Sequence, residues 1–465
     1  MFGTVTLPIW LFALILLFAA VTALSHVFIP PVRWFFRRRL ERAVTQLNKR
    51  LTVPIHPLKL LRRQDMIQRL SYDPVVLEAV AEHARDEHIR EDVAHSTAKR
   101  YAREIVPSFS ATAYFGFATR FARWLSTRLY DVHVTRADDS AVGPNETAVF
   151  VINHRSNMDY VLVTYLAADR SALSYAVGEW ARIWPISRLL RAMGAYFIRR
   201  RSRNTLYRRV LARYVQIATA GGVAQAMFPE GGLSLDGRVG PAKLGLLNYI
   251  VEGHARNGRE IAFVPVSLNY DRVLEDNILV EAGLAGHRRF RGSFLTGSAF
   301  VLRWAWRRMR GKVRRFGVAA VSFGEPIRLG DIGPEPNTKA LARRLMAAIA
   351  GNVPVLAAPM VAKAILDGAS SVQEVTESVS RMRAGFRARG VPVCVPEDDT
   401  AKAVDRALSL YALRHVVSRG KDGALEVLPR GRVILPYYAA SIDDHTKDPN
   451  GLPKNAAPQK GSARI

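Results

Sequence analysis

The sequence predicts an α/β protein with a mostly parallel sheet flanked by helices. From Leu129 onward, short apolar runs alternate with longer helical stretches, which is the pattern of strand–helix–strand units. The run from Ala148 to Asn153 is mostly apolar and β-branched and lacks Gly and Pro, as expected of a strand buried on both faces. Polar residues follow several of these runs directly, so we expect the chemistry at the carboxyl ends of the strands.

The composition of the chain limits its class. With 465 residues, of which 49% are hydrophobic, the chain can bury a large core, and this excludes a disordered protein. A single cysteine, Cys394, excludes an intrachain disulfide and a cysteine-based metal cluster. The net charge of +27 indicates an anionic partner: nucleic acid, an acidic membrane surface or phosphorylated small molecules.

The N-terminal stretch favours the membrane among these partners. Residues 1–32 contain no Lys, Arg, Asp or Glu, and Leu7 to Ile29 is nearly continuous apolar sequence, about the ~20 residues that span a bilayer. A cleaved signal peptide is the alternative, but no positive segment precedes the apolar run. Arginines follow it from Arg33 onward, which predicts one N-terminal span, the bulk of the chain on the cytoplasmic face and attraction to anionic membrane lipids.

The remainder divides by composition into four parts. Residues 33–128 read as a helical region, 129–333 as the α/β domain, 334–445 as a C-terminal helical region, and 446–465 as a polar, Pro/Gly-rich and disordered tail. Within the α/β domain we predict strands at Asp131–Thr135, Ala148–Asn153, Leu173–Val177, Tyr196–Arg199, Ala224–Phe228, Ile261–Leu268 and Phe316–Phe323.

The junction after the second of these strands carries the first candidate site. His154 stands where the strand ends, and Asp159 lies at the start of an apolar helix. Along one continuous helix five residues rotate by ~500°, which would point the side chains apart, but across a strand–turn–helix junction they can meet. A carboxylate that orients an imidazole makes a general base. Alternatively, Ser156 and Asp159 form a capping box at the helix start.

A second copy of the same spacing serves as an internal comparison. His133 and Asp138 also lie five residues apart, but His133 alternates along a probable strand and Asp138 falls in an acidic turn. We therefore interpret this pair as structural.

Further polar positions follow later strands. Arg199 and Arg200 end the run GAYFIRR, where paired arginines at the carboxyl edge of a sheet are suited to a phosphate, although a solvated basic helix is the alternative. Glu230 stands between Pro229 and Gly231, ready to accept bonds from substrate hydroxyls, unless the stretch is an ordinary turn.

One proline interrupts an otherwise apolar strand. Pro265 lies inside IAFVPVSL, where it removes a hydrogen-bond donor from the sheet. This indicates a sheet edge or a pocket wall.

Together these stretches resemble the motif blocks of glycerolipid acyltransferases. Four blocks occur in the family's order: His154-x4-Asp159, Gly194-x-x-Phe197-Ile198-Arg199-Arg200, Phe228-Pro229-Glu230-Gly231 and Val264-Pro265-Val266. The chain is most similar to the membrane-bound glycerol-3-phosphate and dihydroxyacetone-phosphate acyltransferase branch, on NHRSNMDYVLV from Asn153, Asn204-x-Leu206-Tyr207, Lys243-x-Gly245, Tyr270-Asp271-Arg272-Val273-x-Glu275 and Leu435-Pro436-Tyr437-Tyr438.

The resemblance implies the fold of that family and transfer of a fatty acyl group from a thioester to a phosphorylated glycerol-like acceptor. It assigns proton abstraction to His154 and its orientation to Asp159. Phosphate binding would fall to Arg199 and Arg200, hydroxyl orientation to Glu230 and Gly231, and a pocket wall to Pro265. It implies no covalent enzyme intermediate, metal or cofactor; acyl-CoA or acyl carrier protein would be the co-substrate.

One departure from the family concerns the acceptor. The glycerol-3-phosphate branch usually has Arg-Ser-Arg after Glu-Gly-Gly, and here Leu233-Ser234-Leu235 stands instead. Lys243 or Arg238 would have to substitute for the missing cations.

The leading hypothesis is acylation of the sn-1 hydroxyl of glycerol 3-phosphate. Lysophosphatidic acid, dihydroxyacetone phosphate or another lysophospholipid are alternative acceptors, and a non-catalytic basic membrane-binding protein is a third hypothesis. Scattered arginines without a recognition motif argue against nucleic acid.

Overall fold

A computed structural model describes residues 8–11, 13–16, 63–135, 142–143, 145–167, 173–178, 186–199, 202, 204–257, 259–286, 315–333, 337–420, 422–446 and 463–464. The chain forms two units, residues 1–55 and 56–465, and each is considered by itself. Of the predicted N-terminal span, only short helical pieces at 9–11 and 13–16 fall within the described residues. Among the helices of these ranges, none combines the length and the apolar character that crossing a bilayer requires.

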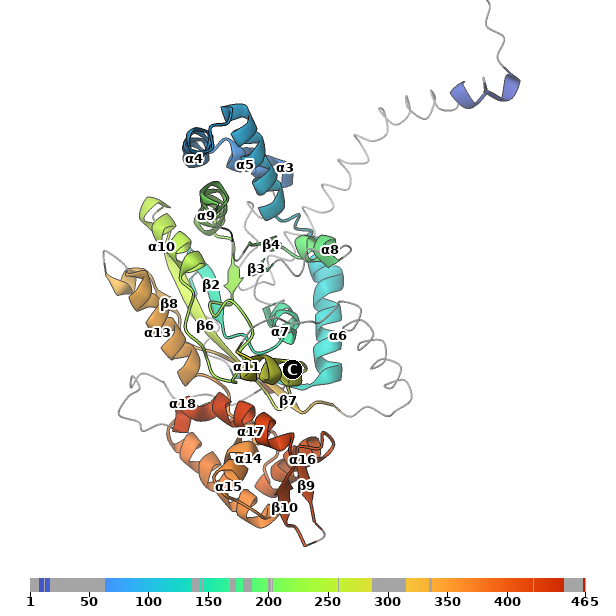
Figure 1. The fold of residues 1–465 in the computed structure, drawn as a ribbon, viewed down its shortest axis with the longest axis vertical. Coiled ribbons are helices and arrows are strands. Elements are labelled where there is room, and N and C mark those ends of the chain that lie inside the picture. The colour runs from blue at the N-terminus through green and yellow to red at the C-terminus, as the bar shows by residue number, and fades with distance from the viewer. Residues whose placement is uncertain are drawn as a thin grey trace, which may run out of the picture. The chain divides into compact units, whose positions relative to one another are not determined.

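One mixed, mostly parallel sheet forms the centre of the second unit (Figure 1). Its strands follow the order β11-β1-β7-β6-β2-β5-β3-β4, and β8 pairs with β6. The strands are β1 (Asp131–Thr135), β2 (Thr147–Ile152), β3 (Ser174–Val177), β4 (Ala195–Phe197), β5 (Gln225–Met227), β6 (Ile261–Tyr270), β7 (Val318–Phe323), β8 (Ile327–Arg328) and β11 (Ala463–Arg464). Strands β4, β3, β5, β2 and β6 are parallel throughout, whereas β7 and β8 run antiparallel to β6 and β11 runs antiparallel to β1.

All seven predicted strands are present. Strand β2 is buried at every position, and its alternate side chains enter two cores, Ala148, Phe150 and Ile152 on one face and Val149 and Val151 on the other. This is the strand buried on both faces that its composition predicts. Strands β8 and β11 were not predicted because two residues are too few for a periodic pattern.

Pro265 lies in the interior of the sheet, so the prediction of a sheet edge is wrong. It pairs with Val151 of β2, and β6 has neighbours on both sides. On its other side, however, β7 ends its pairing at Val266 and β8 begins at Phe263. The carbonyl of Pro265 accepts from Gly324 in the break between them. The missing N–H therefore faces a gap in the ladder, where no partner strand requires it.

Helices cover both faces of the sheet (Figure 1). On one face, α9 and α10 pack together, and α3, α4 and α5 pack on α9. The other face carries the π-helical segment η1, which continues into α6, together with α7. Their bounds are α3 (Arg63–Ser71), α4 (Pro74–Asp86), α5 (Glu91–Ile105), η1 (Thr112–Ala118), α6 (Thr119–Leu129), α7 (Met158–Ala167), α8 (Ile186–Ala192), α9 (Thr205–Ala220), α10 (Gly245–Asn257) and α11 (Asp276–Leu284).

The C-terminal part is helical, with one small hairpin. It contains α13 (Thr338–Gly351), α14 (Ala357–Leu366), α15 (Val372–Ala388), α16 (Thr400–Ala412), α17 (Gly431–Ala439), α18 (Asp443–Thr446), the short turns η3 (Gly330–Ile332) and η4 (Ala440–Ile442), and the hairpin β9 (Val417–Arg419) with β10 (Leu425–Val427). Asn337, Ser371 and Asp399 cap α13, α15 and α16 with their side chains, as expected at helix starts.

The end of the chain departs in part from the predicted disordered tail. Ala463 and Arg464 pair with Val134 and His133 of β1, and Thr446 is still helical. Residues 447–462 lie outside the described residues. A two-residue pairing depends on contacts with a distant strand, which composition does not reveal.

Candidate active site

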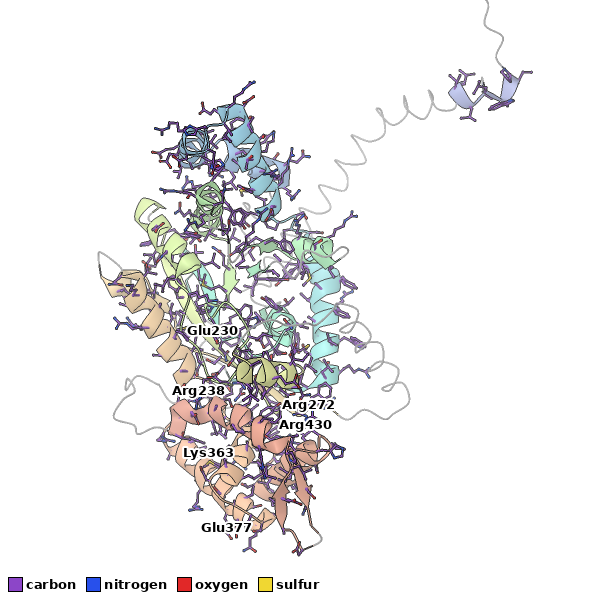
Figure 2. All side chains as sticks on the ribbon, viewed as in Figure 1. Glu230, Arg238, Arg272, Lys363, Glu377 and Arg430 are labelled. Carbon is purple, nitrogen blue, oxygen red and sulfur yellow. The ribbon has the colours of Figure 1, made fainter. Side chains whose placement is uncertain are left out.

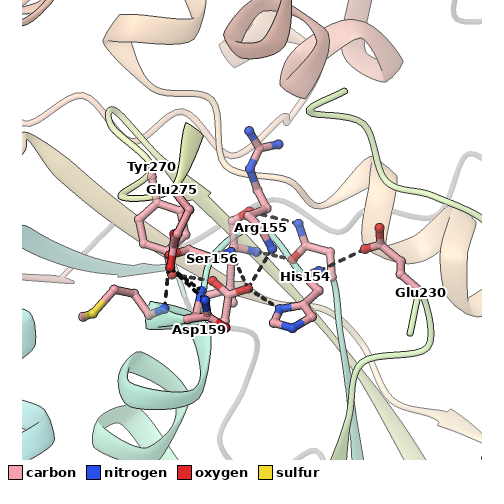
Figure 3. Close-up of polar contacts among 11 residues, drawn as sticks. His154, Arg155, Ser156, Asp159, Glu230, Tyr270 and Glu275 are labelled. Carbon is pink, nitrogen blue, oxygen red and sulfur yellow. Dashed lines mark hydrogen bonds and ion pairs between the residues drawn. The ribbon is translucent and has the colours of Figure 1, made fainter. Parts of the chain in front are cut away.

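His154 and Asp159 meet at the junction of β2 and α7, as their positions predict (Figure 3). His154 follows the carboxyl end of β2, and Asp159 is the second residue of α7. The imidazole Nδ1 lies 2.9 Å from Asp159 Oδ2. Both side chains are buried, with 4% and 0% of their surface exposed. The turn between strand and helix thus allows a contact that one continuous helix would forbid.

Asp159 also caps the helix, so the two alternatives drawn from the sequence hold together. Its Oδ2 accepts the backbone N–H of Arg155 at 2.7 Å and of Ser156 at 3.0 Å, and Ser156 Oγ accepts the N–H of Met158 at 3.1 Å. This is the reciprocal bonding of a capping box. The same oxygen reaches His154, so helix capping fixes the carboxylate that orients the histidine.

The contact with Asp159 decides the tautomer of His154. An ionised carboxylate only accepts hydrogen bonds, so Nδ1 carries the ring proton and Nε2 keeps the basic lone pair. Two aromatic rings hold the imidazole: Phe228, with ring centroids 4.2 Å apart, and Tyr160, at 5.3 Å and nearly perpendicular. The geometry is that of an oriented general base.

Tyr270, the last residue of β6, and Glu275, which follows the strand, support the loop between β2 and α7. The hydroxyl of Tyr270 donates to Asp159 Oδ1 at 2.6 Å. Glu275 accepts from Ser156 Oγ at 2.7 Å and from the backbone and side-chain amides of Asn157 at 3.2 and 3.1 Å. Burial raises the pKa of Glu275 above its ordinary value, against these donors, which lower it. Tyr270 and Glu275 belong to a stretch that resembles the family, but the resemblance assigned no role to either residue.

Glu230 holds the loop between β2 and α7 through the backbone. Its Oε1 accepts the N–H of His154 at 2.9 Å, and its Oε2 accepts the N–H of Gly240 at 3.2 Å. Burial raises the pKa of Glu230 to about 7, although both amides lower it. The structure thus brings Glu230 to His154 as a positioning group; bonding to substrate hydroxyls stays a prediction.

Gly231 and Lys243 lie together beside this glutamate. Gly231 has a φ of +66°, and a Cβ there would lie 2.7 Å from Lys243 Cδ and 3.0 Å from its Nζ. Glycine therefore fits both the backbone and the lysine that runs across it. The exposed Lys243 is anchored by its own N–H, which donates to Pro229. A cation thus stands at the turn where the usual family arginines are absent.

Arg199 is turned toward another partner. Its Nε and a terminal nitrogen donate to the two oxygens of Glu104 on α5, at 2.8 and 2.6 Å, and its guanidinium lies 5.3 Å from the rings of Tyr101 and Tyr207. This ion pair raises the pKa of Arg199. Strand β4 is three strands from β2 in the sheet, about 14 Å at the usual spacing. Phosphate binding by Arg199 stays a prediction, and Arg200 lies outside the described residues.

A buried arginine joins the site to the C-terminal helices. Arg155 is 2% exposed, donates to the carbonyl of Gly237 and lies 5.3 Å from the ring of Tyr437 on α17. A Cβ on Gly237, whose φ is +87°, would lie 1.9 Å from the carbonyl oxygen of Tyr437. In Figure 3 the guanidinium of Arg155 points away from the His154 ring. Position 155 therefore contributes to domain packing, a role that sequence reasoning missed.

The segment Leu233–Arg238 begins where the family usually has arginines, and it contacts the core and the C-terminal helices. Leu233 and Leu235 pack against the core, and the N–H of Ser234 donates to the carbonyl of His154 at 2.8 Å. Arg238 pairs with Asp443 at 2.6 Å. Figure 2 shows Arg238, Arg272 and Arg430 where the α/β part meets the C-terminal helices. Arg238 thus pairs across this boundary, and substitution of Lys243 for the missing cations stays a prediction.

The comparison histidine has a different environment. His133 is buried inside β1, and its Nε2 lies 3.4 Å from Asp131. Asp138 lies outside the described residues. Across the described ranges, no cluster of three or more His, Cys, Asp or Glu side chains has an arrangement that could hold a metal ion.

Two family models match the chain. Residues 131–269 match Acyltransferase, and residues 302–442 match the glycerol-3-phosphate acyltransferase C-terminal region. Most of the sheet and the His154–Asp159 junction thus lie within the part of the chain that matches the acyltransferase domain. The chain belongs to the glycerolipid acyltransferase family, in the branch that carries the glycerol-3-phosphate acyltransferase C-terminal region.

Two relatives by sequence agree with this membership. A glycerol-3-phosphate acyltransferase of Aeromonas hydrophila subsp. hydrophila is 29% identical over 416 residues, which are 83% of this chain and 50% of the relative. One of Pseudomonas aeruginosa is 32% identical over 324 residues, 63% of this chain and 37% of the relative. The chain thus spans half or less of these relatives. The crystal structure of 1-acyl-sn-glycerophosphate acyltransferase of Thermotoga maritima aligns with a TM-score of 0.33 at 17% identity, over 62% of this chain and 96% of that one.

Proposed function

We propose that this protein transfers a fatty acyl group from a thioester to the sn-1 hydroxyl of glycerol 3-phosphate, giving lysophosphatidic acid for phospholipid biosynthesis. The observation that carries the proposal is the 2.9 Å contact between His154 Nδ1 and Asp159, which leaves Nε2 as the basic nitrogen. A hydroxyl is a poor nucleophile at neutral pH, and general-base catalysis is typically worth about 10²–10⁴-fold.

The chemistry is a direct transfer. His154 Nε2 takes the proton of the acceptor hydroxyl, while the oxygen of that hydroxyl attacks the thioester carbonyl carbon. The new C–O bond forms, the C–S bond breaks, and the departing sulfur takes the proton from the imidazolium, giving ester and free thiol. Asp159 offsets the imidazolium charge through Nδ1–H, and Tyr270, Ser156 and Arg155 hold Asp159 in place. The proposal requires no covalent enzyme intermediate, metal or cofactor.

Cations near the site support a phosphorylated acceptor. Lys243 beside Gly231 offers a cation at the turn that holds His154, and Arg199 and Arg200 follow a strand with its carboxyl end at the same edge of the sheet. The two named relatives are glycerol-3-phosphate acyltransferases, which supports glycerol 3-phosphate as the first acceptor to test. Acyl-CoA and acyl carrier protein are both anionic, so the net charge of +27 favours neither donor.

The location follows from the sequence. We propose a single N-terminal span within residues 1–32, followed by arginines that contact anionic lipids, with the catalytic domain on the cytoplasmic face. A reporter fused to the C-terminal end of the chain should then lie in the cytoplasm. A reporter on the outside would remove the access to cytosolic thioesters that the proposal requires.

An acceptor screen tests the function. The purified full chain receives an acyl-CoA or acyl carrier protein donor and one acceptor at a time: glycerol 3-phosphate, dihydroxyacetone phosphate or lysophosphatidic acid. Thiol release is measured. We expect the largest kcat/KM with glycerol 3-phosphate. A preference for lysophosphatidic acid would change the assigned acceptor, and salt-sensitive lipid binding without thiol release by any acceptor would favour a binding protein.

A further inference from the structure

Three aromatic side chains form an exposed row on the helix that precedes the sheet. Phe117, Phe121 and Trp124 are 55%, 46% and 47% exposed. Phe117 and Phe121 stack with ring centroids 5.9 Å apart, and Phe121 and Trp124 stack at the same distance. Their spacing of four and three residues places them along one side of a helix. We call these three residues the aromatic row.

The opposite side of this helix is buried in the core. Tyr114, Ala118, Ala122 and Ser126 are buried, and α6 packs against α7 (Figure 1). The aromatic row therefore does not belong to the core that the helix already covers. Isolated exposed apolar side chains are ordinary, but a contiguous exposed apolar patch marks an interaction surface.

The charged side chains of the segment that carries the aromatic row have one sign. Arg120, Arg123 and Arg128 are exposed, and no Asp or Glu occurs between Glu104 and Asp131. The guanidinium of Arg123 lies 6.0 Å from the ring of Tyr165, and within the described ranges neither Arg120 nor Arg128 pairs with a carboxylate. An anionic partner surface would complement these arginines.

We infer that the aromatic row and its arginines dock on the surface of an anionic lipid bilayer. Aromatic side chains are favoured at the membrane–water interface, and a helix with apolar and arginine side chains on its outward face lies in that plane. The arginines would meet lipid phosphates while the rings enter the acyl boundary. The apolar N-terminal stretch, Leu7 to Ile29, also favours a bilayer over a second protein as the occupant.

This docking adds a second contact, within the acyltransferase part, to any N-terminal anchor. It does not depend on the proposed function. Because α6 packs on α7, and Asp159 is the second residue of α7, docking would hold the junction of His154 and Asp159 near the bilayer. This last consequence rests on the proposed function: its lipid product would have a short path into the membrane.

A position-specific probe tests the inference in the full chain. The single cysteine, Cys394, is buried, and burial raises the pKa of its thiol to about 12, so it competes poorly for a thiol-reactive dye. In a Cys394→Ala background, Phe121→Cys and, separately, Trp124→Cys are labelled with an environment-sensitive fluorophore. Leu413→Cys, at a position 62% exposed after α16, is the matched control. Each protein is incorporated into phosphatidylcholine vesicles with or without phosphatidylglycerol, and quenching by brominated acyl chains is measured.

We expect several-fold stronger quenching at positions 121 and 124 than at 413, and more in vesicles with phosphatidylglycerol. Arg120→Glu with Arg128→Glu should abolish the dependence on phosphatidylglycerol. Quenching at 121 and 124 no greater than at 413 would overturn the inference, however the chain is anchored. So would a spectral change at 121 that depends on protein concentration without lipid, because it would identify a second copy of the chain as the occupant.

Discussion

The hydroxyl of Tyr270 donates a 2.6 Å hydrogen bond to Asp159 Oδ1, from a residue 111 positions further along the chain. Asp159 uses its other oxygen for His154 and for two backbone amides. The carboxylate is therefore fixed from both sides, by the turn it caps and by the end of β6. The orientation of the histidine depends on contacts that are both local and distant.

Tyr270→Phe should weaken catalysis without disturbing the fold. The change removes one hydrogen bond to a charged group, worth about 1.5–3 kcal/mol, so kcat should fall about tenfold or more while the acceptor KM stays constant. Steady-state thiol release measures both. Tyr130→Phe is the control, because the Tyr130 ring lies 5.3 Å from that of Tyr270 and its hydroxyl donates to the carbonyl of Arg272, not to Asp159. Equal losses of kcat in the two variants would show that the hydroxyl of Tyr270 has no special role.

Arg199→Ala should mainly raise the KM for the acceptor. A bidentate charged contact with phosphate is worth about 1.5–3 kcal/mol, which corresponds to a change of about 10- to 150-fold. Glu104→Gln is the control: it removes the charge that now pairs with Arg199 but keeps the guanidinium, so KM should change less. A lower melting temperature with an unchanged KM in Arg199→Ala would show that Arg199 stabilises the packing of α5 and does not bind the acceptor.

Glu230→Gln should flatten the pH dependence of stability. The folded-state pKa of about 7 lies above the ordinary value of 4.5, so the native state keeps a proton that the unfolded chain has lost. The free energy of unfolding should then fall as pH rises from 4.5 to 7, by about 3 kcal/mol from this group. Urea unfolding at pH 5 and pH 8 measures the slope. The exposed Glu281→Gln should keep the wild-type slope, and the same slope in Glu230→Gln would contradict the assignment.

Gly237→Ala should destabilise the junction with the C-terminal helices. The new methyl group would meet the carbonyl oxygen of Tyr437 and force an unfavourable φ, together worth about 2–5 kcal/mol. Gly423→Ala isolates the backbone term, since its φ is +83° and no atom lies within 4 Å of its added Cβ. It should cost only about 1–2 kcal/mol. The same melting temperature for both variants would argue against close contact between Gly237 and α17.

The sequence predicts what is local. The bounds of β1 agree at both ends, and His154 and Asp159 come together because one turn connects them. Strand direction is not local: the apolar pattern of β7 is the same whether it runs parallel or antiparallel to β6. Likewise, the approach of Glu275 to Ser156 depends on the packing of segments 119 residues apart.

Polar side chains illustrate the same limit. A strand end predicts where Arg199 emerges, but its guanidinium turns to Glu104, 95 residues earlier in the chain. The buried position of Arg155 depends on α17, which closes over it from the C-terminal part. In both cases the partner is set by tertiary packing, which residue spacing does not encode.

The turnover of His154→Ala is the most direct test of the account. With glycerol 3-phosphate and a thioester donor, kcat should fall by about 10²–10⁴-fold while far-UV circular dichroism and melting temperature stay near the wild-type values. His133→Ala is the control, because His133 is the other histidine that lies five residues before an aspartate. Its kcat should exceed that of His154→Ala by about 10²–10⁴-fold. Wild-type kcat in His154→Ala, with turnover lost in His133→Ala, would contradict the assignment of His154 as the general base.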